Sequence, residues 1–146
     1  MKAKQLTRSQ GFTLMEIMVV LVIIGLLVGV VAPNIMGQLE RAKIETAYRD
    51  MNTLSSLLDS YKIDNNRYPT TEQGLQALVT KPDVDPIPRR YLPGGYTKKV
   101  NKDPWGNDYV LISPNDAGGF DLYSFGPDGV DGTEDDLSSN DELEEE

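Results

Sequence analysis

The stretch GFTLMEIMVVLVIIGLLVGVVAP, residues 11–33, decides the fold, because it places one acidic residue at the start of a long apolar run. A leader with three basic and no acidic residues precedes it, and residues 17–32 carry no charged or strongly polar side chain. Glu16 stands immediately before that run. An unpaired carboxylate is costly to bury in an apolar environment, so we expect Glu16 to have a partner.

Two plainer interpretations of this stretch leave Glu16 unexplained. An ordinary secretory signal is cleaved after a small-x-small site, and Val30-Val31-Ala32 before Pro33 is a poor one. A simple membrane anchor needs about 20 apolar residues, which residues 12–32 supply. Neither interpretation gives the carboxylate a role. We therefore expect residues 12–37 to form a hydrophobic helix that first spans a membrane and then packs against other copies of the chain.

The composition excludes several classes of function. The net charge of −9 comes from the C-terminal end, because residues 134–146 contain eight acids and no base, whereas the preceding residues contain 15 acids and 14 bases. No basic surface exceeds the acids around it, so we expect no nucleic-acid partner. The chain has no cysteine and no histidine, which excludes a disulfide and removes the commonest general base. We therefore expect that the chain has no enzymatic activity.

Apolar residues recur at helical spacing from Leu39 to Ile63 and predict an amphipathic helix. They are Ile44, Ala47, Tyr48, Met51, Leu54, Leu57, Leu58 and Tyr61. If residues 12–63 form one helix, it is about 78 Å long, more than a small domain can cover. Its uncovered apolar part must contact lipid first and other subunits afterwards. Pro33 predicts a kink or local melting between Ile24 and Gly37.

The rest of the chain predicts a small domain. Asn65 and Asn66 before Pro69 predict the end of the helix. A shorter helix at 72–80, strands at 108–113 and 120–125, and a third short strand at 96–100 are expected to follow. Trp105, in a turn at 103–107, is interpreted as a core residue.

The predicted fold class is α+β. A long N-terminal α-helix, with a hydrophobic transmembrane or filament-core half and an amphipathic half, packs on a small C-terminal domain. That domain has a short helix and a two- to three-stranded antiparallel sheet. We expect a basic leader at residues 1–11, the hydrophobic helix at 12–37, the globular domain at 38–136, and a disordered acidic tail at 137–146.

A cluster of acids lies in GPDGVDGTEDD, residues 126–136. Its members are Asp128, Asp131, Glu134, Asp135 and Asp136. Calcium takes six to eight oxygen ligands, and carboxylates this close in sequence repel one another without a cation. The spacing is not that of an EF-hand. On chemistry alone, a solvated acidic turn is somewhat favoured over a metal site, and both remain open.

The GFTLME start before an apolar helix resembles the signal of type IV pilins and pseudopilins. The stretches YPTTEQGLQAL (68–78) and DPWGNDY (103–109) resemble the major pseudopilins of type II secretion, so the resemblance covers most of residues 11–136. It implies that a prepilin peptidase cuts between Gly11 and Phe12 and methylates the amino group of Phe12. Glu16 is then the fifth residue of the mature chain and pairs, during assembly, with the terminal amine of a neighbouring copy.

The resemblance also implies a calcium ion in the acidic loop. Mapped onto this chain, its ligands are the carboxylates of Asp128, Asp135 and Asp136, backbone carbonyls at Phe125 and Val130, and an oxygen of Thr133. Asp131 and Glu134 could face outward. Calcium would then supply the cross-link that no disulfide can provide here.

The implied function is that of the structural major subunit of the type II secretion pseudopilus, a helical homopolymer that drives export of folded proteins across the outer membrane. The implied partners are other copies, the prepilin peptidase, minor pseudopilins, an inner-membrane assembly platform, the outer-membrane secretin and the lipid bilayer. The subunit would cross the bacterial inner membrane once, with a cytoplasmic N-terminus and a periplasmic domain. Two alternatives are a type IV pilus subunit and a membrane-tethered calcium-binding module that acts as a monomer.

Overall fold

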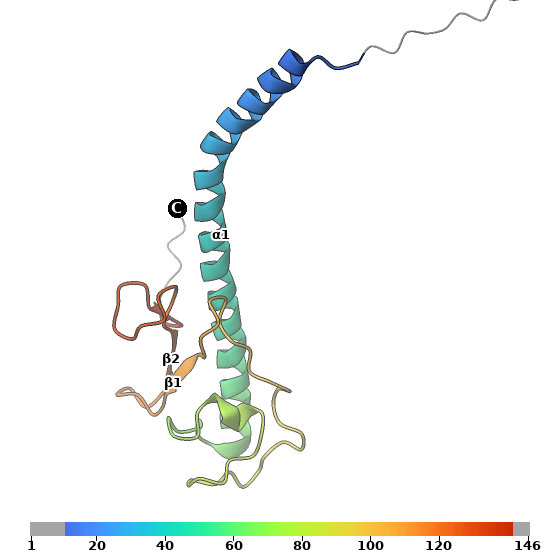
Figure 1. The fold of residues 1–146 in the computed structure, drawn as a ribbon. Coiled ribbons are helices and arrows are strands. Elements are labelled where there is room, and N and C mark those ends of the chain that lie inside the picture. Colours follow the sequence, from blue (N-terminus) through green and yellow to red (C-terminus); the bar gives the residue numbers. More distant parts are fainter. Residues whose placement is uncertain (1–10, 142–146) are drawn as a thin grey trace, which may run out of the picture. The chain divides into compact units, whose positions relative to one another are not determined.

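The computed structural model describes residues 11–141, apart from the side chains of residues 30–35. The elements, in chain order, are α1 (Leu14–Asn65), the 3-10 helix η1 (Leu75–Leu78), β1 (Val110–Ile112), β2 (Asp121–Ser124) and β3 (Leu137–Ser138) (Figure 1). This is the α+β fold predicted from the sequence. The chain divides into two compact units, Met1–Leu39 and Glu40–Glu146.

Both ends of α1 have local causes. At its start, the backbone N–H of Glu16 donates to the hydroxyl oxygen of Thr13 at 3.2 Å, which is the bond of a helix N-cap. At its end, Asn66 adopts a left-handed conformation with φ of 59°, and its N–H donates to the carbonyl of Lys62. The helix runs unbroken between these ends, so of the kink or local melting predicted between Ile24 and Gly37 the melting does not occur. A proline removes a single N–H from the ladder, and the remaining helical bonds continue.

No helical stretch within the described residues combines the length and the apolar character needed to cross a membrane. The span predicted at residues 12–37 stays a prediction.

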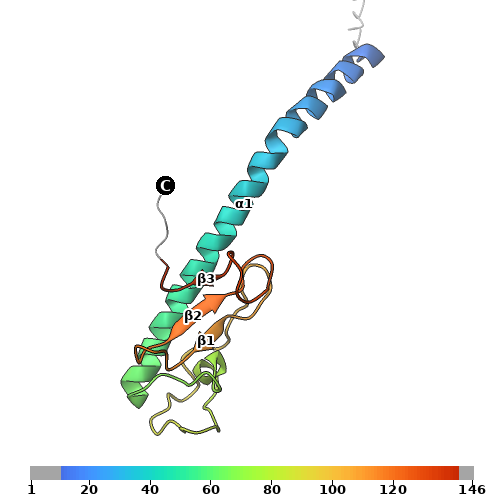
Figure 2. The ribbon, with the colours of Figure 1, turned by 90° about the vertical axis from the view of Figure 1, so that its left-hand side faces the viewer.

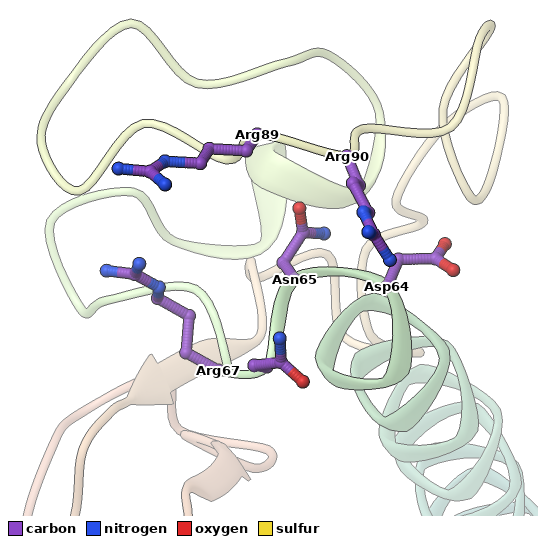
Figure 3. Close-up of a pocket in the computed structure, with 6 residues that line it drawn as sticks. Asp64, Asn65, Arg67, Arg89 and Arg90 are labelled. Carbon is purple, nitrogen blue, oxygen red and sulfur yellow. The ribbon is translucent and has the colours of Figure 1, made fainter.

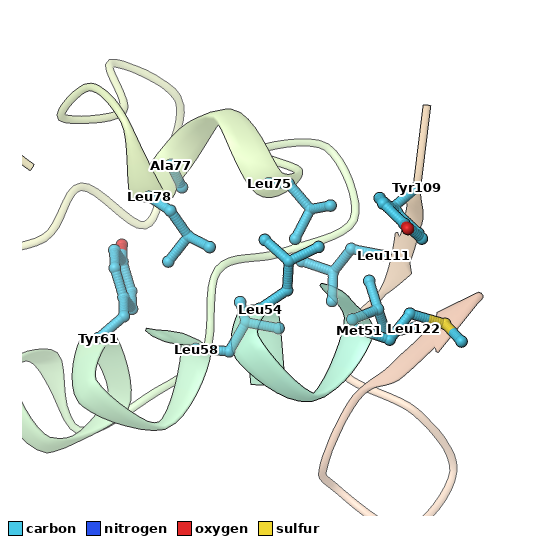
Figure 4. Packing of buried hydrophobic residues seen from close by; sticks show 10 residues of the cluster. All are labelled: Met51, Leu54, Leu58, Tyr61, Leu75, Ala77, Leu78, Tyr109, Leu111 and Leu122. Carbon is cyan, nitrogen blue, oxygen red and sulfur yellow. The ribbon is translucent and has the colours of Figure 1, made fainter. Parts of the chain in front are cut away.

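The core of the second unit forms around one face of α1 (Figure 4). Residues at intervals of three and four along the helix are buried, as the amphipathic pattern predicts. The buried side chains of α1 are Ala47, Met51, Leu54, Leu58 and Tyr61, and those that pack on them from η1 and the strands include Leu75, Leu78, Tyr109, Leu111 and Leu122. Trp105 is half-buried and is not a member of this cluster, so its interpretation as a core residue is wrong.

The sheet has the order β1-β2-β3, and both pairs are antiparallel (Figure 2). Leu111 of β1 is opposite Leu122 of β2, and Tyr123 of β2 is opposite Ser138 of β3. The third strand is therefore not the segment 96–100. The N–H groups of Tyr96 and Thr97 donate to the carbonyl of Leu78 in η1 instead, which leaves them unavailable to a strand.

The prediction of a disordered tail is wrong for residues 137–141. Leu137 packs against the core cluster, and the N–H of Ser139 donates to the carbonyl of Leu122 at 2.8 Å. Residues 142–146 of the predicted tail lie outside the described residues. The predicted short helix is also reduced to the four residues of η1, because Gly74 before it takes a φ of 57° that an α-helix cannot continue through.

Replacing Leu58 by alanine is expected to destabilise the domain by about 2–5 kcal/mol, because the side chain is fully buried and its removal leaves a cavity. Ser56→Ala, on the exposed face of the same helix, is the control and should change stability by less than about 0.5 kcal/mol. Urea unfolding of the detergent-solubilised chain measures both. Equal midpoints for the two variants would contradict the packing described.

Candidate functional site

The N-terminal part of α1 presents a continuous apolar surface. Every large hydrophobic side chain from Phe12 to Val28 is exposed by between 46% and 81%. Apolar surface of this extent is rare on a chain that acts alone and marks a region covered by lipid or by a partner.

Glu16 lies at the beginning of this surface, in the first turn of α1. A carboxylate is favourable there, because the unpaired N–H groups of a helix N-terminus carry partial positive charge. Among residues 11–141 the Glu16 carboxylate makes no ion pair or hydrogen bond. Gly11 and Phe12 precede the helix and are exposed, so the bond predicted to be cut is accessible.

The DPWGN turn is fastened by Asp103, which is buried although it is charged. Its carboxylate accepts hydrogen bonds from the N–H of Asn107 at 2.7 Å, from the N–H of Trp105 at 3.1 Å, and from the hydroxyl of Ser124. These bonds close the turn and join it to β2. They compensate the cost of burying the carboxylate.

Trp105 connects this turn to α1. Its indole Nε1 donates to the Glu40 carboxylate at 2.6 Å, and the Lys43 ammonium lies 3.6 Å from the other oxygen of that carboxylate. This contact was not predicted from the sequence. The available signal was the indole N–H, which needs an acceptor whenever tryptophan is partly buried.

The acidic loop is tightly closed at its base. Gly126 has a φ of 61°, and a side chain there would overlap the carbonyl oxygen of Asp135. Within the loop, Asp128 accepts from the N–H of Val130 at 2.9 Å, and the Thr133 hydroxyl donates to the carbonyl of Val130 at 3.3 Å.

The predicted calcium ligands are only partly brought together. Asp128 and Val130 are exposed, whereas Phe125, Thr133, Asp135 and Asp136 are half-buried. One oxygen of Asp136 accepts from the N–H of Gly132 at 2.8 Å, and the other is buried without a hydrogen-bond partner among the described residues. No three acidic side chains in the part of the chain described here gather closely enough to hold a metal ion. Asp131 and Glu134 are exposed.

Three buried or half-buried tyrosines next to carboxylates have raised pKa values. Burial raises the pKa of Tyr96 to about 12, and its hydrogen bond to Asp64 adds to the effect. Burial, followed by the charge of Asp50, also raises the pKa of Tyr109, which donates to that carboxylate at 3.2 Å. Burial raises the pKa of Tyr123, with further contributions from carboxylates of the acidic loop. Tyr96 and Tyr109 thus serve as hydrogen-bond donors to carboxylates of α1.

Two family models match the chain. The prokaryotic N-terminal methylation motif matches residues 6–32, and the type II secretion system (T2SS), protein G model matches residues 34–140. A methylation motif that includes the first part of a long helix, followed by a small α+β domain, defines the class of pilin-like proteins.

Similar proteins narrow this class. Type II secretion system core protein G of Pectobacterium carotovorum subsp. carotovorum is 55% identical over 132 residues, which cover 90% of this chain and 85% of the relative. The protein of the same name from Escherichia coli K12 is 52% identical and is covered to 91%. The crystal structure of the major pseudopilin from the type 2 secretion system of enterohaemorrhagic Escherichia coli superposes with a TM-score of 0.67 at 51% identity, covering 73% of this chain and 93% of that one. The chain belongs to the type II secretion system protein G family.

Asp103→Asn is expected to destabilise the domain by about 1.5–3 kcal/mol, because an amide offers one acceptor oxygen where three donors converge on a charged group. Asp108→Asn is the matched control, because that carboxylate is exposed and forms an exposed ion pair with Lys102 at 3.6 Å, which contributes little to stability. Thermal unfolding, followed by the fluorescence of Trp105, measures the difference. A stability loss for Asp103→Asn no larger than for Asp108→Asn would refute this role.

Proposed function

We propose that the chain is the structural major subunit of a type II secretion pseudopilus and that it has no enzymatic activity. The observation that carries the proposal is the exposed apolar surface of residues 12–28 with one carboxylate at its beginning, on a member of the protein G family. In this role the subunit polymerises from the bacterial inner membrane, and the filament drives folded proteins across the outer membrane.

Assembly begins with processing at the N-terminus. A prepilin peptidase cuts between Gly11 and Phe12 and methylates Phe12, a step supported by the match to the methylation motif. Glu16 of one copy then pairs with the terminal amine of the next. Breaking such a pair inside an apolar filament leaves an uncompensated charge, so the pair fixes the register between copies.

The proposal places the chain in the inner membrane as a single-pass protein before assembly. Its N-terminus is cytoplasmic and its domain periplasmic, because the leader is basic. The partners are other copies, minor pseudopilins, the inner-membrane assembly platform and the outer-membrane secretin. The assembly platform extracts the chain from the bilayer, and the growing filament moves folded proteins through the channel in the outer membrane.

We also propose that the acidic loop binds calcium. The ligands would be Asp128, Asp135 and Asp136, with carbonyl oxygens of Phe125 and Val130 and an oxygen of Thr133. The buried and unpartnered oxygen of Asp136 supports this assignment, because such an oxygen is costly without a donor or a cation. The donors are the hard oxygens that calcium prefers, and the ion would have to draw the exposed Asp128 toward the half-buried carboxylates.

Glu16→Ala is expected to be processed normally but to assemble poorly. Loss of a buried pair costs about 3–5 kcal/mol, which corresponds to roughly a 100-fold or greater decrease in the assembly constant. Electron microscopy of cells that produce the complete secretion machinery counts the filaments, and mass spectrometry of the protein reads the cleavage. Glu72→Ala, at an exposed residue of the domain, is the control.

Abundant normal filaments from Glu16→Ala would refute the pairing. Chemical crosslinking of the native protein in membranes tests the function itself. A ladder of oligomers is expected, and a single monomer band would favour the membrane-tethered module instead.

Calcium at 100 times its dissociation constant is expected to stabilise the domain by about 2.7 kcal/mol, because the ion binds only the folded loop. Calorimetry with calcium and with a chelator should show this as a higher melting temperature in calcium. Asp128→Ala should lose most of the difference, whereas Asp116→Ala, in the exposed 114–119 turn, should keep it. No effect of calcium on the native chain would remove the metal from the proposal.

A further inference from the structure

A basic cleft lies at the C-terminal end of α1 (Figure 3). It has a volume of about 570 Å³, and six residues line it: Asp64, Asn65, Asn66, Arg67, Arg89 and Arg90. Arg67 comes from the segment directly after α1, and the other two arginines come from the proline-rich segment that follows η1. Figure 3 shows the side chains of Arg67 and Arg89 extending in the same direction.

The backbone that carries these arginines is held in place. The side-chain amide of Gln73 donates to the carbonyls of Val84 at 2.7 Å and Pro86 at 3.2 Å, and Pro88 is buried. The fold therefore forms the cleft, because Arg89 and Arg90 follow Arg67 by 22 and 23 residues in the sequence.

The three guanidinium groups of the cleft make no ion pair and no hydrogen bond within residues 11–141. Asp64 is the single carboxylate among the lining residues, and it already accepts a hydrogen bond from the Tyr96 hydroxyl at 2.9 Å. The lining thus carries three positive charges and one negative charge. Guanidinium groups bind carboxylates with directed hydrogen bonds, so the cleft suits a ligand with several carboxylates.

Asn65 holds the end of α1 in place beside the cleft. Only 9% of this residue is exposed, and it is one of the lining residues. Its amide nitrogen donates to the carbonyl of Tyr61 at 3.0 Å and to the hydroxyl of Tyr96, which fixes the orientation of the amide, while its oxygen is buried. The charge of the cleft therefore selects the ligand. An acidic peptide brings several carboxylates to the three arginines at once, which a simple anion does not.

The chain itself contains such a peptide. Residues 142–146 read ELEEE and follow the last strand of the domain. We propose that the cleft binds this glutamate-rich segment of a second copy of the chain. The proposal relies on the proposed function only to bring a second copy close, and it adds a contact between domains to the contact between N-terminal helices.

The segment of a second copy is favoured over the segment of the same copy. Asp141, the last described residue, is close enough to Tyr48 for its charge to contribute, after burial, to a raised pKa of that phenol. Tyr48 precedes Asn65 by 17 residues of α1, which is about 25 Å along the helix axis. Five extended residues span at most about 18 Å. Within one copy the segment would have to run fully extended along α1, whereas a second copy can supply it without that constraint.

An ion pair between one cleft arginine and one glutamate of the segment is exposed and weak by itself. We therefore expect a modest affinity that depends on several such pairs together. It should also depend on salt, because the screening length falls from about 10 Å at 0.1 M to about 3 Å at 1 M ionic strength.

A peptide titration tests the chemistry without any filament. The probe is a fluorescently labelled peptide with the sequence of residues 137–146, and the receptor is the detergent-solubilised full chain with residues 142, 144, 145 and 146 changed from Glu to Gln. We expect saturable binding that weakens about tenfold or more in Arg67→Gln/Arg89→Gln/Arg90→Gln and in high salt. A peptide with the same four glutamates replaced by glutamine, and a receptor with Lys98→Gln and Lys99→Gln, are the controls. Binding that is absent, or that is unchanged by the three arginine substitutions, overturns the proposal.

Disulfide crosslinking then identifies the copy that provides the segment. The chain has no cysteine, so Asn66→Cys and Glu144→Cys introduce unique thiols. Co-production of the two single variants should give a crosslinked dimer. Neither variant should give this dimer alone. The control pair of Asp116→Cys with Glu144→Cys should not give it either. A chain with both thiols that closes only on itself would overturn the contact between copies. If filaments form normally but the crosslinked dimer does not, this inference is overturned and the proposed function is not affected. If the peptide binds but no filaments form, the proposed function is overturned and the cleft still binds the segment.

Discussion

The structure depends on a mismatch between the length of α1 and the extent of the core that covers it. The helix has 52 residues, but among the side chains that the structure describes the buried ones begin only at Ala47. The periodic face from there to Tyr61 is covered by η1 and the strands of the same chain. The large apolar side chains from Phe12 to Val28, and those of Met36 and Leu39, are exposed instead. A chain of this design buries its own core and still requires an external apolar environment, which is the physical basis of a subunit that can leave a membrane for a filament.

The domain is fixed to α1 by polar contacts as well as by the core. Hydrophobic contacts are not directional, so they do not by themselves set the position of the domain along the helix. The Trp105–Glu40 and Tyr109–Asp50 hydrogen bonds provide that direction, because each joins a side chain near β1 to a specific turn of α1. The absence of cysteine makes these bonds more important, since no disulfide shares the task.

The sequence predicted the long helix and two strands because each follows a regular pattern. The spacing of apolar residues in α1 and the paired β-forming runs around the 114–119 turn are local signals. β3 carries no such signal: it has two residues in a polar and acidic region and exists because Leu137 reaches the core. The segment 96–100 has the local signal of a strand but does not form one, because the N–H groups of Tyr96 and Thr97 donate to the carbonyl of Leu78. The basic cleft could not be predicted either, because the fold alone brings Arg67 to Arg89 and Arg90. The ligand set of the acidic loop rested on resemblance rather than on spacing.

The close approach of Gly126 to the carbonyl of Asp135 gives the acidic loop a narrow neck. The eight residues between them begin and end at nearly the same point. The pairing of β2 with β3 therefore does not depend on the conformation of these eight residues. The entropy of closing such a ring increases only slowly with the number of residues in it. The length of the loop can therefore change while the sheet keeps its register. A segment that tolerates changes in length is thus attached at a position that admits no side chain.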